Sequence, residues 1–220
     1  MQSPLFKPSA TLPRVTESPH FPARIVGAHA VFEQRNKQIA KFAGTDLAEV
    51  GYLFIEDRRR FASTVEVVFE PGSKRMLFLR AERFETASLA LELTVEREAE
   101  AHVVLLIKND AEAAIAADIK GKIAEKGNLT LSIFHLDQGQ TTADVSILAA
   151  TGAHSDVALF DVGRGKSKAD FRLENICAAP FSGGQLTTRC MLYDQAQSRI
   201  QAVPMIVQDG HDTSNHLDQM

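Results

Sequence analysis

The sequence predicts an all-β chain that folds as a parallel β-helix, preceded by a short N-terminal α/β segment. From residue 61 onward, short runs of alternating apolar and polar residues are separated by small or polar bends. Units of this kind recur along the chain at a nearly constant spacing. Hydrophobic residues make up 45% of the 220 residues and charged residues 24%, which is typical of a globular domain and excludes a disordered chain.

The N-terminal region, before residue 61, differs in composition from the rest. Five of the eight prolines lie within residues 1–22, so we expect residues 1–27 to form a flexible, extended arm. Residues 28–60 are expected to form a small mixed segment of helix and strand. Within it, apolar residues at roughly helical intervals favour a short helix over 28–42, and 47–55 fits either a helix or a strand. The apolar residues at helical spacing are Val31, Phe32, Ile39 and Phe42.

Residues 61–220 are expected to form the β-helix core domain. Each unit reads as two strands of about six residues joined by a bend, as in FASTVEVVFEPGSKRMLFLRA. Units begin near Ser63, Ser88, Ala114, Thr142, Lys168 and Arg199, so the chain repeats at a nearly constant interval. A period in this range is the signature of a solenoid, in which each unit buries its apolar face against its neighbours.

One unit fits two secondary structures. In AEAAIAADIKGKIAEKG (111–127), the isoleucines fit a helical spacing and also a strict alternation with small residues. Gly121 in the middle would cost a helix about 1 kcal/mol. Its place within the repeat series therefore favours a strand. An antiparallel sandwich or barrel remains the alternative fold, although few Asn-Gly or Asp-Gly hairpin signals are present.

Composition also limits function and location. The net charge is -4 and the isoelectric point is near 6.0, which argues against a protein that mainly binds nucleic acid or anionic lipid. No apolar run approaches the roughly 20 residues that span a bilayer, and the N-terminus lacks a signal-peptide pattern. We therefore expect a cytoplasmic protein without a membrane or nucleic-acid partner.

Few residues carry recognisable chemistry. Cys177 and Cys190 are expected to be reduced thiols, because two cysteines do not make the framework of a small secreted protein. His211 and His216 lie in DGHDTSNHLDQM, where histidines and aspartates crowd together; the segment is either a metal-ligand cluster or a disordered terminus. VGRGKSK (162–168) lacks the spacing of a phosphate-binding loop. No catalytic site emerges from the residues.

The segment CAAPFSGGQLTTRCMLYDQAQSRIQAVPMIVQDGHDTSNH (177–216) resembles the core of the SufB/SufD family, the scaffold proteins of the SUF iron–sulfur cluster assembly system. The residues that can be laid onto the family pattern are Pro180, Ser182, Gly183, Leu192, Asp194, Ala196, Ser198, Ile200 and Thr213. The coils before it, over about 61–175, look like the right-handed parallel β-helix of that family.

The chain departs from the family pattern at several places. Cys177 stands where the family usually has histidine, and Ala202 stands where it usually has glycine. The sequence ends at Met220 and so is short at its C-terminus. Family members continue there with a further coil and a helical region, which hold the cluster-building Cys, His and Glu residues and the SufC-docking surface. None of those residues is carried over to this chain.

The resemblance implies a scaffold and not an enzyme. The chain would pair with a SufB/SufD-like subunit and a SufC-like ATPase, and a transient iron–sulfur cluster would form at the subunit interface through sulfur and imidazole ligands. Candidate ligands are Cys177, Cys190, His211 and His216. An open β-helix end also favours a homo- or hetero-oligomer.

Two other functions compete with this one. The first is a non-catalytic β-solenoid that binds a protein or carbohydrate without iron–sulfur chemistry. The second is a metal-dependent enzyme of the double-stranded β-helix kind. That enzyme needs two histidines and a carboxylate at fixed spacing, and the sequence lacks this pattern.

Overall fold

The structure is a computed structural model that describes residues 23–26, 30–34, 37–47, 50–56, 60–82, 86–108, 113–207 and 212–219. These residues form two eight-stranded sheets, and no helix among them is long and apolar enough to span a bilayer. Sheet A contains β1 (Ala23–Val26), β4 (Val50–Glu56), β6 (Lys74–Glu82), β8 (Glu100–Lys108), β10 (Asn128–Asp137), β12 (His154–Gly163), β14 (Gly183–Leu192) and β16 (Ser214–Gln219). Sheet B contains β2 (Ala30–Gln34), β3 (Lys37–Phe42), β5 (Arg60–Phe69), β7 (Thr86–Val95), β9 (Ala114–Ile123), β11 (Gln140–Ala149), β13 (Lys168–Cys177) and β15 (Gln197–Ile206).

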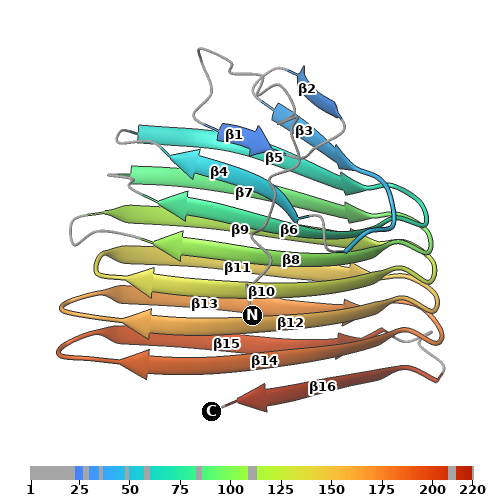
Figure 1. Cartoon of the computed structure of the whole chain (residues 1–220). Helices are drawn as coiled ribbons and strands as arrows, with labels where there is room; N and C mark the ends of the chain where they lie inside the picture. The colour runs from blue at the N-terminus through green and yellow to red at the C-terminus, as the bar shows by residue number, and fades with distance from the viewer. Residues whose placement is uncertain are drawn as a thin grey trace, which may run out of the picture.

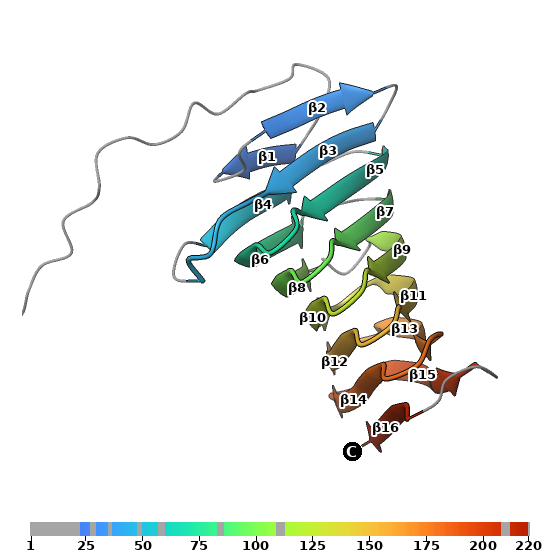
Figure 2. The same ribbon diagram turned by 90° about the vertical axis from the view of Figure 1, so that its right-hand side faces the viewer.

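The chain winds as a right-handed parallel β-helix with a flattened cross-section (Figures 1 and 2). From β3 onward each strand of one sheet is followed by a strand of the other, so that one coil adds one strand to each sheet. Six coils, from β5–β6 to β15–β16, stack with parallel pairing throughout. The exceptions lie at the N-terminal end, where β1 is antiparallel to β4 and β2 is antiparallel to β3.

The pairing register confirms the repeat that the sequence predicts. Equivalent positions in successive coils of sheet B recur at a nearly constant interval, and each predicted unit start lies at or just after one of them. The equivalent residues are Arg60, Thr86, Ala114, Gln140, Lys168 and Gln197. The parallel pairing also excludes the antiparallel sandwich and barrel.

The core lies between the two sheets and follows from strand alternation. In β8 and β12, for example, every second residue is buried, and the others point to the outside. The interior is mostly aliphatic, and each large side chain that is fully buried stabilises the fold by about 1.5–3 kcal/mol. The largest fully buried side chains include Phe42, Phe69, Leu91, Leu105, Ile119 and Phe171.

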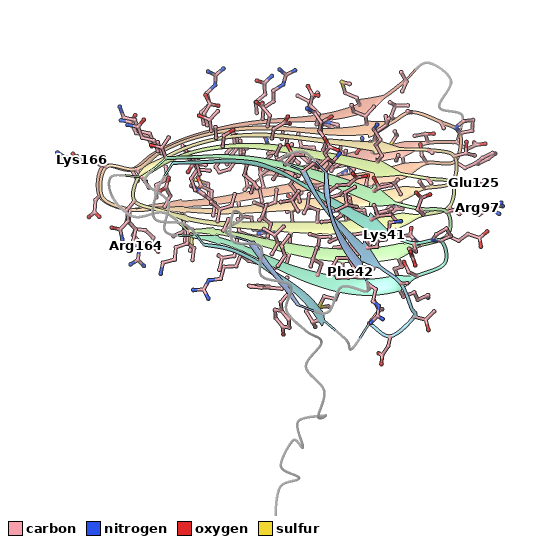
Figure 3. All side chains as sticks on the ribbon, turned by 90° about the horizontal axis from the view of Figure 1, so that it is seen from above. Lys41, Phe42, Arg97, Glu125, Arg164 and Lys166 are labelled. Carbon is pink, nitrogen blue, oxygen red and sulfur yellow. The ribbon has the colours of Figure 1, made fainter. Side chains whose placement is uncertain are left out.

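The two ends of the flattened coil are made by stacked turns, and residues of both ends are labelled in Figure 3: Arg97 and Glu125 at one end, Arg164 and Lys166 at the other. Five turns of the first end have a residue with φ between 58° and 67° at their third position: Gly72, Glu98, Lys126, Gly152 and Phe181. Glycine adopts this conformation freely, whereas it costs Glu98 and Lys126 about 1 kcal/mol each. Backbone hydrogen bonds between adjacent turns, such as Glu98 N–H to the Glu125 carbonyl at 3.1 Å, hold them there.

Two expectations for the N-terminal region need correction. The helix expected over 28–42 is wrong for the described residues of that range, which form β2 and β3. Inward-facing Ala40 and Phe42 are buried on the first coil, so sheet pairing has overridden the helical spacing. Strand β1 also lies within the range expected to be a flexible arm, while residues 1–22 lie outside the described residues.

The ambiguous segment 111–127 contains β9, as predicted. The glycine in the middle of this strand is explained by lack of space for a side chain. Gly121 points into the interior, and a Cβ at this position would lie 2.5 Å from Cδ1 of Ile147 on the next coil. A larger residue would overpack the core here.

Candidate functional site

Toward the C-terminal coils the interior of the β-helix becomes polar at one end of the flattened section. We call this group the His135 cluster, and it consists of His135, Asp137, Thr141, Asp161 and Cys190. It lies where β10, β12 and β14 finish and β11 begins, which is the end of the coil that carries Arg164 and Lys166 (Figure 3). The first four members are at most 2% exposed, and Cys190 is partly exposed.

Strand alternation and coil register bring these residues together. His135 and Asp137 are two residues apart in β10, so both point inward. His135 pairs in register with Asp161 of β12, and Asp161 pairs with Cys190 of β14. The three side chains therefore form one column across three successive coils. Thr141 reaches this column from the first residues of β11, just after the tight 138–139 connection.

The hydrogen bonds define the protonation state of the histidine. Nδ1 lies 2.7 Å from Oδ1 of Asp161, and Nε2 lies 2.9 Å from Oγ1 of Thr141. The single hydroxyl proton of Thr141 is donated to Oδ2 of Asp137 at 3.1 Å, so the hydroxyl oxygen accepts from Nε2–H. An ionised Asp161 can only accept, so Nδ1 also carries a proton. This set of acceptors favours the imidazolium form of His135, between two carboxylates.

The shifts in pKa agree with this arrangement. Burial lowers the pKa of His135, but hydrogen bonds to Asp137 and Asp161 outweigh it, so the pKa stands above its ordinary value of 6.5. Burial raises the pKa of Asp161, but hydrogen bonds to His135 and Ser198, together with the charge of His135, outweigh it and lower the pKa overall. The two residues thus stabilise each other as a buried ion pair.

Cys190 is the member of the cluster that solvent can reach. Its thiol donates to Oδ2 of Asp161 at 3.5 Å. Burial, followed by the negative charge of Asp161, raises the pKa of the thiol. At neutral pH Cys190 is therefore a protonated thiol, and it must release its proton before it can bind a metal ion.

A second polar group fills the opposite end of the same coils. Asn175 of β13 is fully buried and its Oδ1 accepts a hydrogen bond from the Ser155 hydroxyl at 2.6 Å. Its Nδ2 donates to the Ser155 and Gln185 carbonyls at 3.1 and 3.3 Å, and its own carbonyl accepts from Asn215 Nδ2 at 2.7 Å. This network ties β12, β13, β14 and β16 together and has the features of a structural element.

The candidate ligands from the sequence are not brought together. Cys177, at the end of β13, is fully buried, and its thiol contacts the Ser214 carbonyl at 3.8 Å. Ser214 pairs with Gly183, at the start of β14, whereas Cys190 lies near the far end of that strand, a distance of about 23 Å. The two thiols therefore lie at opposite ends of the coil.

The two histidines of the tail also stand apart from the cysteines. His216 is exposed in β16 and pairs with Gln185, which is about 17 Å along β14 from Cys190. His211 lies outside the described residues. Within the described ranges, no three His, Cys, Asp or Glu side chains are placed to hold a metal ion together.

The candidate ligands chosen from the sequence included only Cys190 of the His135 cluster. A signal for it was present. Residues one coil apart stack, and Asp161 follows His135 by one period of the repeat, as Cys190 follows Asp161 by the next. The pair His135 and Asp137 also has the spacing that puts two side chains on one face of a strand.

Residues 54–219 match the family model described as "SUF system FeS cluster assembly, SufBD core domain". The chain belongs to the SufBD family. The match extends from within β4 to the end of β16, so it coincides with the six coils of the parallel β-helix. A search of curated proteins gave no match.

Membership of the SufBD family confirms the resemblance seen in the sequence. Several residues that carry the resemblance lie in the connections of the last coils. Pro180 and Ser182 are in the turn from β13 to β14, and Asp194 and Ala196 are in the turn from β14 to β15. Ala202 replaces the usual glycine on β15, where it packs against the core opposite Leu173. The family assignment places this chain in SUF iron–sulfur cluster assembly.

Proposed function

We propose that this SufBD-family chain is a non-catalytic scaffold subunit of the SUF system, working in the cytoplasm. In this role it pairs with a SufB/SufD-like subunit and a SufC-like ATPase, and the iron–sulfur cluster is the cargo of the complex. The observation that carries the proposal is the family match over the whole β-helix. The His135 cluster adds a thiol at the surface end of a buried charged column.

The ligand set supports a site shared between subunits. Iron–sulfur clusters are held by several soft ligands, usually thiolates. Among the described residues only Cys190 and Cys177 are thiols, and they lie at opposite ends of the coil. Cys190 is partly exposed, whereas Cys177 is fully buried. We therefore propose Cys190 as a ligand from this chain, with the other ligands supplied by the partner subunit.

In this proposal, Asp161 and His135 control the orientation and protonation of the Cys190 thiol. Binding of iron requires the thiolate and thus releases a proton. Asp161 accepts the thiol hydrogen bond and is itself paired with the protonated His135. The column fixes the direction of the thiol and keeps Cys190 protonated until a cation arrives.

The experiment is an anaerobic co-purification of the tagged chain with a SUF ATPase and a full-length SufBD-family partner. Bound protein, iron content and visible cluster absorbance are measured on the same sample. We expect partner and cluster to be retained, and Cys190→Ser to lower the iron content at least several-fold. Cys177→Ser is the matched control, because its thiol is buried at the other end of the coil.

Each other outcome separates the candidate functions. Retention of the partner without cluster, or iron that is insensitive to Cys190→Ser, contradicts the ligand role of Cys190 and leaves a structural subunit. A folded sample that retains neither partner nor cluster contradicts the scaffold function. The non-catalytic binding solenoid would then be the better account of the fold.

A further inference from the structure

A polar hollow lies on the outer face of sheet B, where β11, β13 and β15 begin. Its volume is about 350 Å³, which is within the range of small-molecule sites. The strands form its floor, because Thr141, Ala169 and Ser198 line it while strand alternation directs their side chains inward. We call it the Arg199 hollow. Its walls are two rows of outward side chains in register, Gln140, Lys168 and Gln197 in the first and Thr142, Asp170 and Arg199 in the second.

The charged side chains of the Arg199 hollow lack a partner in the part of the chain that the structure describes. On the same face, Lys120 lies 2.6 Å from Asp118. In contrast, Lys168, Asp170 and Arg199 form no ion pair or side-chain hydrogen bond with any described residue. This holds although Asp170 and Arg199 are in register on adjacent strands. Their charges therefore remain available to a ligand.

The charge around the hollow favours an anion, although the chain as a whole has a net charge of -4. The walls hold two cations against one carboxylate. The turn just before β13 adds Arg164 and Lys166, at the end of the coil where Figure 3 labels them. The turn before β15 adds one acid, Asp194. Positive groups therefore outnumber negative ones among the described residues of the walls and these two turns.

The lining also limits the kind of anion. No aromatic or large aliphatic side chain is among the described residues that line the hollow, so a flat ring has nothing to stack on. Gln140, Gln197 and Thr142 present amide and hydroxyl groups, whereas Asp170 can only accept hydrogen bonds. A bare anion would be repelled by Asp170, but a hydroxyl group beside the anionic centre would donate to it. The lining therefore favours an anion that carries hydroxyl groups.

We propose that the Arg199 hollow binds a small hydroxylated anion, a carboxylate or phosphate with at least one hydroxyl group. Arg199 holds the anionic group by two parallel hydrogen bonds, as guanidinium groups do with carboxylates and phosphates. Lys168 adds a second positive charge from the adjacent strand, and Asp170 accepts a hydrogen bond from the hydroxyl group. This site goes beyond the proposed function, because it lies on the outer face and uses none of the candidate cluster ligands.

The test is a titration of the ¹⁵N-labelled, metal-free chain, followed by the amide signals in NMR spectra. Citrate is compared with tricarballylate, which lacks the hydroxyl group, and glycerol 3-phosphate is compared with propyl phosphate, which lacks both hydroxyl groups. The two pairs also distinguish a carboxylate from a phosphate as the anionic group. We expect at least one hydroxylated probe to bind with a Kd of about 1 mM or tighter, and its matched analogue to bind about tenfold more weakly. The shifts should concentrate at residues 140–142, 168–170 and 197–199.

Variants of the walls test the role of each charge. Arg199→Gln and Lys168→Gln should each weaken binding by about tenfold, because each removes a charge-assisted hydrogen bond. Asp170→Ala should remove the preference for the hydroxylated probe. Lys120→Gln is the matched control, because Lys120 is an exposed cation on the same face, pairs with Asp118 and does not line the hollow. All four substituted side chains are exposed, so the variants should keep the fold, which circular dichroism checks.

Four results overturn the proposal. They are a folded chain that binds none of the probes at about 10 mM, binding that is unaffected by Arg199→Gln, an equal loss of binding in Lys120→Gln, and equal affinity within both pairs of probes. The third would show only a general attraction of anions, and the fourth would exclude the hydroxyl contact. The titration needs no metal and no partner subunit. A chain that binds the probes but no iron–sulfur cluster therefore contradicts only the proposed function, and a scaffold that binds none of the probes contradicts only this site.

Discussion

The imidazole of His135 and the carboxylate of Asp161 lie 2.7 Å apart in the interior of the β-helix, on adjacent coils of sheet A, and both side chains are fully excluded from solvent. Two charged groups of this kind are costly to bury unless each is paired. Here Asp137 and Thr141 complete the hydrogen bonding of the ring. The cluster therefore couples the stability of the C-terminal coils to pH and sets the environment of Cys190.

Replacing Asp161 removes the nearest counter-charge of a buried imidazolium. We expect Asp161→Asn to lower the free energy of unfolding by about 3 kcal/mol, because breaking a buried pair leaves one charge uncompensated. Denaturant unfolding monitored by circular dichroism measures this change. Asp156→Asn is the control, since Asp156 pairs with His154 at the surface and should change stability by less than about 1 kcal/mol. Equal effects of the two substitutions would contradict a buried ion pair.

The stability should depend on pH through His135. Its pKa is raised in the folded chain, so its stabilisation is fully present below the ordinary value of 6.5 and is lost as pH rises through the folded pKa. We expect the free energy of unfolding to fall above pH 6.5 in the wild type. In His135→Gln this decrease should be absent, and the difference between the two curves isolates the histidine. A difference that is constant with pH would mean that His135 is neutral.

Asp161 should act at the acidic end of the range. Its folded pKa is lowered, so its stabilisation is present above the ordinary value of 3.8 and is lost as pH falls through the folded pKa. We therefore expect Asp161→Asn to be less sensitive to acid than the wild type below about pH 4. Thermal unfolding between about pH 2 and about pH 5 measures the two profiles. Parallel profiles would show that Asp161 keeps an ordinary pKa.

The two cysteines should differ in reactivity. Cys190 is partly exposed with a raised pKa, so we expect it to react slowly with a disulfide reagent at about pH 8. Cys177 is fully buried and should react only on unfolding. Asp161→Asn removes a charge that raises the pKa of Cys190 and should speed its reaction. A slower reaction in that variant, or equal rates for the two thiols, would contradict the geometry of the column.

The Asn175 network should hold β16 in place. Asn215→Ala removes the side-chain donor of β16 that bonds to the Asn175 and Met205 carbonyls at 2.7 and 3.3 Å, which costs about 1–3 kcal/mol. We expect faster amide hydrogen exchange in β14 and β16, measured by mass spectrometry. Asn128→Ala is the control, because Asn128 is exposed at the start of β10. Unchanged exchange in β16 would show that backbone pairing alone retains it.

Much of the fold could be predicted because apolar and polar residues alternate along each strand. The strand of residues 114–123 was identified by its place in the repeat, and the structure explains its glycine by the close approach of Ile147. The left-handed conformation of Glu98 and Lys126 could not be predicted. These residues are held there by hydrogen bonds between stacked turns, and such contacts exist only once the coils are in register.

The candidate site was less accessible to sequence reasoning. Cys190 was identified as a thiol, but its partners Asp161 and His135 come from the two preceding coils. The pairing of Cys177 with Cys190 as ligands of one site was suggested by residue type alone. The structure separates them because they lie at opposite ends of a flattened coil, about 23 Å apart along the strand direction.

The amino-acid sequence by itself determined that buried and exposed residues alternate within each strand, because burial on one face of a strand requires a period of two residues. It also determined that the coils recur and stack, because stacking requires equivalent residues one coil apart. It also carried the resemblance that the family match confirms. The tertiary structure alone decided which polar residues meet inside the coil and which side chains point outward. Those properties depend on register between coils, because a shift of one residue would turn His135 to solvent and Phe134 into the core.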